Sequence, residues 1–313
     1  MARTVKDAAY LLQAIAGRDA RDNYTSAAPA TLPDYVGACR FDGLKGVRLG
    51  YPSNVIALYA NTTRYFPILN AYQSMIKVMQ AAGAIIVDTP FTGLNEYRLS
   101  GNSSIVLGAD FKTDVRNYFD ELKTNPNKIK TEEDLRDWTE SHPQEQWTPT
   151  SRDVTVWNNS LALGFGNKSP KFWAAYQANL YLGGEATLLG AIRRNNVTAI
   201  IMPTAFSAGF AAIVGAPVIT VPMGKYPANT TVTTSRFNVT TAGPSMSSIK
   251  HRRQAEANTL TDFPFGLSFM GDLFTEEKLI PLAYAYEQRT HIRDTVQPYI
   301  QPSIELSDMV KRR

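Results

Sequence analysis

Apolar residues near the start of the chain recur at helical spacing. They predict a helix over residues 5–16, whose apolar face is formed by Val5, Ala8, Leu12 and Ile15. Thr4 precedes this segment and Asp7 lies three residues further on, a pattern typical of a capped helix start, while Gly17 marks the expected end. We therefore expect the chain to open inside ordered structure.

A strand, a helix and a second strand are predicted next. Residues 46–52 have the pattern of a short strand closed by a turn, and residues 64–82 form an amphipathic pattern that ends at Gly83. Residues 84–87 are an apolar run of the kind found in buried strands. Because a helix joins the two strands, the segment predicts a parallel βαβ unit.

The middle of the chain is predicted to be helical. Residues 104–122 and 131–141 have helical patterns, and the second starts with Thr131 as a cap followed by three acidic residues, which the helix dipole favours. Residues 170–195 carry large apolar residues at helical spacing and predict one long helical stretch.

Three further strands and a helix are predicted in the last third. The strands cover residues 199–202, ended by Pro203, then 218–221, bracketed by two prolines, and 266–270, while a helix is expected over residues 276–290. The segment 203–215 is expected to be a loop at a strand end, the default place for a ligand in such folds. The fold class predicted is α/β, a mixed β-sheet flanked by helices.

A single domain is expected to cover residues 1–302. Within it, residues 225–262 are rich in Thr and Ser and predict a long surface loop, and residues 303–313 form a basic tail. No internal repeat is visible.

Composition excludes several classes of function. The net charge of +4 is spread along 313 residues without a dense basic block, so we expect no nucleic-acid partner. The longest apolar runs are too short to span a bilayer, and no signal peptide is expected, because residues 1–4 lead straight into a helix. Cys39 is the only cysteine, which excludes an intrachain disulfide and makes a Cys-based metal site untenable.

Motifs that could carry catalysis or cofactors are weak when taken alone. Two stretches, Gly101–Ser104 and Gly243–Ser248, resemble the glycine-serine loops of hydrolases, but neither lies in a tight turn between a strand and a helix. The first is predicted to be the N-cap of the following helix, and the second part of the long loop. No metal-ligand spacing and no paired carboxylates occur, so neither a metal nor another cofactor is expected.

Asn-x-Ser/Thr sequons are frequent, which hints at passage through the secretory route. The alternative is that the Thr-rich composition produces sequons that carry no glycan. Pro170, just after the sequon at Asn167, makes glycosylation of that site less favourable. The candidate glycosylation sites are Asn23, Asn61, Asn102, Asn158, Asn196, Asn229 and Asn238.

Several stretches together resemble one enzyme family. Residues 1–9, Met-Ala-Arg-Thr-Val-Lys-Asp-Ala-Ala, resemble the segment that lies just after the catalytic core of amidase-signature enzymes. Later landmarks of that family follow in order over about residues 1–302, with details most like the fungal amidases: residues 43–50 (Gly-Leu-Lys-Gly-Val-Arg-Leu-Gly), 110–112, 200–204 (Ile-Ile-Met-Pro-Thr), 215–222 (Gly-Ala-Pro-Val-Ile-Thr-Val-Pro), 264–271 and 283–288.

The resemblance implies the C-terminal portion of the amidase-signature fold. The family uses a serine nucleophile, a second serine in a cis peptide and a lysine base, and all three belong to a region that precedes the matched segments. The resemblance therefore assigns no catalytic residue here, and Lys112 or Lys225 is not a credible substitute. It does imply one wall of a substrate pocket, with Phe206, Ser207 and Ile213 facing an amide. Ala212 stands where an Asn is common, which favours an apolar amide.

Two functions remain open at this point. The chain is expected to be part of an amidase that hydrolyses a linear carboxamide to an acid and ammonia or an amine, and to be inactive alone. The alternative is a non-catalytic binding or regulatory remnant. Without the N-terminal half of the family fold, the chain would expose strands and an apolar face. We therefore expect a partner, which is either a missing or separately encoded N-terminal half or a second copy of the chain.

Overall fold

The structure is a computed structural model that describes residues 2–142, 144, 154–227, 230–231, 233–234, 240–241, 259–260 and 263–295. The tail predicted at 303–313 and the stretch Gly243–Ser248 lie outside these residues, as does much of the loop predicted at 225–262. None of the helices in the described part is long and apolar enough to cross a membrane.

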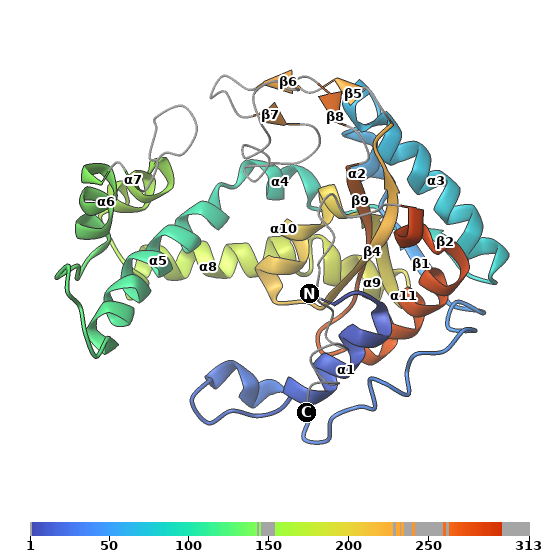
Figure 1. The fold of residues 1–313 in the computed structure, drawn as a ribbon, viewed down its shortest axis with the longest axis horizontal. Coiled ribbons are helices and arrows are strands. Elements are labelled where there is room, and N and C mark those ends of the chain that lie inside the picture. Colours follow the sequence, from blue (N-terminus) through green and yellow to red (C-terminus); the bar gives the residue numbers. More distant parts are fainter. Residues whose placement is uncertain are drawn as a thin grey trace, which may run out of the picture.

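Helices make up most of the described chain (Figure 1). The α-helices are α1 (Val5–Ile15), α2 (Ser53–Ala57), α3 (Phe66–Ala81), α4 (Leu94–Leu99), α5 (Asn102–Glu121), α6 (Glu132–Ser141), α7 (Thr155–Ala162), α8 (Pro170–Gly183), α9 (Leu188–Arg194), α10 (Thr204–Val214) and α11 (Glu276–Thr290). The described residues also include the short 3-10 helices η1 (Asn23–Ala27), η2 (Thr63–Tyr65) and η6 (Ile292–Thr295).

A five-stranded mixed sheet forms the centre of the molecule, in the order β2-β1-β3-β9-β4. Its strands are β1 (Arg48–Tyr51), β2 (Ile85–Asp88), β3 (Ala199–Pro203), β4 (Val218–Lys225) and β9 (Pro264–Met270). The strands β2, β1 and β3 are parallel, whereas β9 runs antiparallel to both β3 and β4. Two-residue strands form two further pairs, β5 (Thr230–Thr231) with β8 (Thr259–Leu260), and β6 (Thr233–Thr234) with β7 (Thr240–Thr241).

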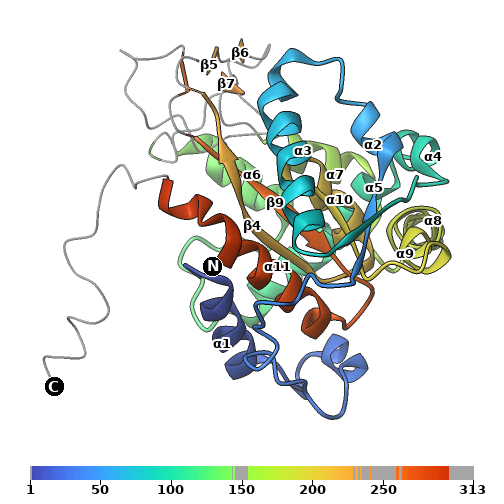
Figure 2. The ribbon, with the colours of Figure 1, turned by 90° about the vertical axis from the view of Figure 1, so that its right-hand side faces the viewer.

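Helices cover both faces of the sheet, as the contacts of successive side chains along β9 show. Phe269 contacts Tyr286 of α11, with ring centroids 6.2 Å apart, whereas its neighbour Ser268 contacts Thr204 and Ser207 of α10. Successive side chains of a strand point to opposite faces, so α11 and α10 lie on opposite sides. Helix α3 packs on the α11 side, where the Tyr72 hydroxyl donates to the Ile201 carbonyl at 2.9 Å. Figure 2 shows α3 and α11 from this side.

The predicted α/β class and the parallel βαβ unit are confirmed. Strands β1 and β2 pair in parallel through α3, and α11 has the predicted bounds, Glu276–Thr290. The capping predictions also hold, because Thr4 and Thr131 each form a capping box with the aspartate three residues later. Local signals were therefore sufficient for these elements.

Outside residues 203–215, three predictions about helices and strands were wrong. The helical stretch predicted at 170–195 is broken into α8 and α9, because the backbone leaves the helical region at Gly184 (φ −89°, ψ −97°) and Thr187 (φ −129°, ψ −105°). The apolar run predicted to be a buried strand forms the edge strand β2, where Ile85 is 49% exposed. Strand β4 continues through Pro222 to Lys225, since an edge strand with a register shift tolerates a residue without an N–H.

An arm of helices extends from the sheet (Figure 1). Helices α5 and α8 pack side by side, and α6 and α7 pack against α5 at the far end. Within the arm, Ser160 of α7 joins three helices, because its hydroxyl lies 2.7 Å from the Gly108 carbonyl of α5 and 2.8 Å from Glu132 of α6. It stands apart from the main core, which is built around the sheet.

Candidate functional site

The segment at the carboxyl end of β3, expected to be a loop, is the helix α10. Pro203 occupies its N-cap position, and Gly215 closes it in the left-handed conformation, with φ of +68°. We expected a loop because Pro and Gly often interrupt helices and strands, whereas Pro203 and Gly215 lie at the two ends of one helix. All three residues of the predicted substrate wall therefore lie on this helix.

Phe206 lies in a cluster of aromatic rings and is 7% exposed. Its ring is parallel to that of Tyr59, with centroids 3.8 Å apart, and Tyr65 meets both rings edge-on. The guanidinium of Arg64 lies 4.6 Å from the centre of the Tyr65 ring. Phe206 thus joins α10 to the segment that contains α2 and η2.

Ser207 is buried, and its hydroxyl is engaged within the protein. Ser207 Oγ lies 3.1 Å from the Thr204 carbonyl oxygen and 3.0 Å from Ser268 Oγ. Ser268 Oγ is also 3.0 Å from the hydroxyls of Thr204 and Thr220, so four hydroxyl groups meet between α10, β4 and β9. No lysine or histidine in the described part hydrogen-bonds to this cluster, so the described residues supply no base of the kind that a serine nucleophile requires.

Ile213 lies further along α10 and packs on α8. It is half-buried, and a Cβ added at Gly183 of α8 would lie 2.5 Å from Ile213 Cγ2. Seven residues separate it from Phe206, which places the two about 10 Å apart along the helix axis. The fold therefore brings Phe206 and Ser207 into one turn and leaves Ile213 two turns away.

Sequence reasoning missed the tyrosines that cover α10. Tyr97 of α4 stacks on Phe210 with ring centroids 4.6 Å apart, just as Tyr59 stacks on Phe206. Burial raises the pKa of both tyrosines, so both phenols stay neutral near pH 7 and can donate a hydrogen bond. The i, i+4 spacing of Phe206 and Phe210 was the one local signal of this aromatic surface.

Other candidate groups show no sign of catalysis. Cys39 is half-buried, and burial raises the pKa of its thiol, which keeps it in the unreactive thiol form. Gly101 is the N-cap of α5 in the left-handed conformation, so the first glycine-serine stretch begins a helix as predicted. Within the described ranges, no group of three His, Cys, Asp or Glu side chains could hold a metal ion.

The sequons differ in exposure. Asn102 is half-buried at the start of α5, and the amide of Asn167 donates to Asp110 at 3.0 Å. Two candidate sites, Asn229 and Asn238, lie outside the described residues. The exposed ones are Asn23, Asn61, Asn158 and Asn196.

Comparison with known proteins gives a consistent result. The model of the family Amidase matches residues 1–280. A protein of the fungus Arthroderma benhamiae that bears the name amidase is 43% identical over 312 residues, covering 99% of this chain and 49% of its own length. A relative of the same name from Arabidopsis thaliana is 28% identical and covers 93% of this chain and 48% of its own length.

Among solved structures, native peptide amidase from Stenotrophomonas maltophilia matches with a TM-score of 0.70 at 25% identity. The match covers 93% of this chain and 53% of the peptide amidase chain. An amidase family protein from Bacillus anthracis has the same fold, with a TM-score of 0.68 at 22% identity over 95% of this chain and 49% of its own. The chain thus spans about half the length of the relatives that it matches.

Proposed function

The chain belongs to the amidase family, and from that premise we propose that it is the C-terminal part of an enzyme that hydrolyses a linear carboxamide. The products are a carboxylic acid and ammonia or an amine. In the amidase-signature enzymes that the chain resembles, the nucleophilic serine, the bridging serine and the lysine base precede the segments matched here, and we expect the same arrangement in this enzyme. The chain by itself is therefore inactive, and its contribution is to bind the substrate.

The aromatic surface of α10 is the observation that supports this role. Phe206 and Phe210 lie one turn apart, and each is covered by a tyrosine ring, Tyr59 or Tyr97. Helix α10 contains no charged and no amide side chain. Phe206 and Phe210 are only 7% and 6% exposed, so we expect the half-buried rings of Tyr59 and Tyr97 to face the substrate. They suit an apolar group beside the scissile amide, because aromatic rings bind apolar groups without providing a partner for a charge.

We also propose that the other half of the family domain covers the edge of strand β4. In the described part of the sheet, β4 pairs only with β9, and Val218 is 42% exposed. Beside it, α1, β4 and α11 enclose an apolar cavity of 160 Å³ lined by residues such as Leu12 and Ile280. A strand edge next to an apolar surface promotes aggregation unless another chain segment covers it.

The test compares the chain alone with the chain co-expressed with the N-terminal half of the Arthroderma benhamiae relative. Release of ammonia is measured for a series of primary amides that runs from short aliphatic to aromatic. We expect no turnover by the chain alone, turnover by the complex, and a preference of the complex for aromatic and branched amides. Turnover by the chain alone would refute the proposal.

Two controls make the result specific. The N-terminal half alone must be inactive, and Phe206→Ala in the complex must reduce the preference for aromatic amides, whereas Tyr24→Ala, at a side chain that is 85% exposed, must leave it unchanged. A soluble homodimer of the chain that buries β4 would instead identify a second copy as the partner.

A further inference from the structure

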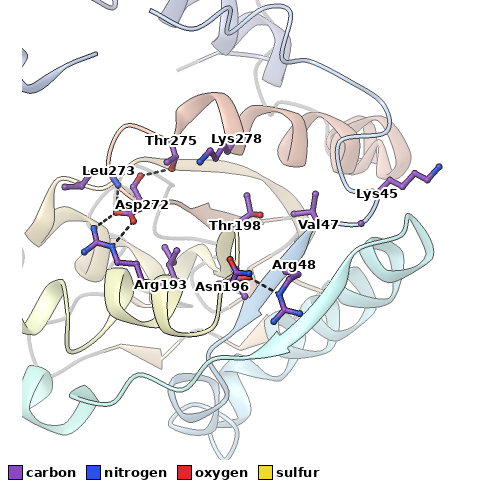
Figure 3. A pocket seen from close by; sticks show the side chains of 13 residues that line it. Lys45, Val47, Arg48, Arg193, Asn196, Thr198, Asp272, Leu273, Thr275 and Lys278 are labelled. Carbon is purple, nitrogen blue, oxygen red and sulfur yellow. Dashed lines mark hydrogen bonds and ion pairs between the residues drawn. The ribbon is translucent and has the colours of Figure 1, made fainter. Parts of the chain in front are cut away.

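A second cavity lies at the other end of the sheet from α10. Its volume is 680 Å³, and three segments line it: residues 45–48 before and at the start of β1, residues 192–198 before β3, and residues 272–278 leading into α11. Figure 3 shows these segments meeting around the cavity. Because β3 separates the two regions, they lie about 16 Å apart along the strand.

Positive charge exceeds negative charge in this cavity. Lys45, Arg48, Arg193 and Lys278 line it, against a single carboxylate, Asp272. Arg193 and Asp272 neutralise one another through two hydrogen bonds, Nε to Oδ2 at 2.9 Å and Nη2 to Oδ1 at 2.8 Å. The guanidinium lowers the pKa of Asp272, so that carboxyl is ionised near pH 7. Lys45, Arg48 and Lys278 form no ion pair in the described part of the cavity, although the charge of Lys278 also helps to lower the pKa of Asp272.

These three cations differ in how they are held. Arg48 donates from Nε to the Asn196 carbonyl at 2.9 Å and from Nη2 to the Asn195 carbonyl at 3.1 Å, which fixes its position without cancelling its charge. Among the described residues, the amino groups of Lys45 and Lys278 make no ion pair or hydrogen bond. Figure 3 shows Lys45 reaching outward, on the far side of the cavity from Arg193 and Asp272.

We propose that this cavity binds a small molecule that carries a phosphate group. A phosphate with two negative charges matches a site with surplus cations, and charge-assisted hydrogen bonds to lysine and arginine are the strongest that it can form. The cavity is larger than a bare phosphate, and Val47, Ile192 and Leu273 offer an apolar lining for an organic part. Thr198 and Asn196 add neutral polar groups.

This proposal does not depend on amide hydrolysis. The cavity is formed within this chain, away from α10, so phosphate binding can be measured on the chain alone or on its complex with an N-terminal half. Failure of one proposal leaves the other standing.

The test is calorimetric titration of bacterially produced protein, in which Asn196 carries no glycan. Inorganic phosphate and glycerol 3-phosphate are titrated separately at constant ionic strength, with sodium chloride as the reference salt. We expect dissociation constants of about 0.1–1 mM and tighter binding of the ester. Equal affinity for the two would remove the organic part of the proposal, and no binding at about 10 mM would overturn the proposal altogether.

Two variants with opposite expected effects separate a specific site from general attraction to a basic surface. Lys278→Gln should weaken binding about five-fold, whereas Asp272→Asn should strengthen it, because it removes the only carboxylate and releases Arg193. Lys77→Gln, on the exposed side of α3, serves as the matched control and should change nothing. Circular dichroism checks the fold of each variant. Equal weakening by Lys77→Gln and Lys278→Gln would refute a specific site.

Discussion

The ring of Tyr59 lies flat against the ring of Phe206, with centroids 3.8 Å apart and an angle of 3° between the planes. The two residues are 147 positions apart in the sequence. Tyr65 closes the contact from the side, with its centroid 5.2 Å from that of Phe206. This stack fixes α10 against the βαβ unit, so the orientation of the proposed substrate wall depends on it.

Phe206→Ala should destabilise the folded chain by about 3–5 kcal/mol, because it removes a buried ring and leaves a cavity beside Tyr59 and Tyr65. Urea unfolding followed by circular dichroism measures the loss. Tyr24→Ala removes an aromatic ring that is 85% exposed, and should change the free energy of unfolding by less than about 0.5 kcal/mol. A similar loss in both variants would contradict the packing described for Phe206.

Thr131→Ala should destabilise α6 by about 1 kcal/mol, because the threonine hydroxyl accepts from the Asp134 N–H at 3.1 Å and caps the helix. Hydrogen exchange should show faster exchange in the first turn of α6 and unchanged exchange in α11. Thr131→Ser keeps the hydroxyl and should behave like the original chain. Equal effects of the two substitutions would exclude capping as the cause.

Gly215→Ala should cost about 1 kcal/mol through backbone strain alone. Gly215 ends α10 with φ of +68°, and an added Cβ would meet no atom within 4 Å, so no clash contributes. Gly215→Asn should cost less, since asparagine tolerates the left-handed conformation. Thermal unfolding of the two variants gives the comparison, and a larger loss for asparagine than for alanine would be inconsistent with strain.

Glu132→Gln should remove a pH-dependent part of the stability. Glu132 is 2% exposed, Ser160 donates to its Oε2 at 2.8 Å, and its Oε1 has no hydrogen-bond partner in the described structure. Burial raises the pKa of this carboxyl, so the folded state holds its proton more tightly than the unfolded state does. The associated stability is present below the pKa of the unfolded chain and is lost as the pH rises through the folded pKa.

The free energy of unfolding, measured by urea between about pH 4 and pH 8, should therefore fall with rising pH more steeply for the original chain than for Glu132→Gln. Glu133→Gln is the control, because Glu133 is exposed on the same turn of α6. Parallel pH profiles for the original chain and Glu132→Gln would show that Glu132 does not titrate in this range.

Sequence patterns predicted the elements whose signals are local. Thr131 and Asp134 lie three residues apart, and the βαβ unit needs only two apolar runs with a helix between them, so nothing distant had to be known. The exposure of Ile85 could not be found in this way, since an apolar residue has the same pattern in a central strand and in an edge strand.

The candidate site was only partly predictable. Family resemblance indicated Phe206, Ser207 and Ile213, but nothing near them in the sequence indicates Tyr59 or Tyr97, which cover the same helix. The hydroxyl cluster around Ser268 likewise joins residues from α10, β4 and β9. Such contacts depend on the packing of distant segments, which periodicity and capping do not encode.

The sequence by itself determined the α/β class, the resemblance to the amidase-signature enzymes and the bounds of helices such as α11, because propensity, capping and short motifs act within a few residues. Only the tertiary structure decided that residues 204–214 form a helix, that the helical stretch 170–195 is interrupted after Gly183, and that four cationic side chains line one cavity. Each of these results from side chains that meet across the sheet or between helices, where burial and close packing outweigh local preference.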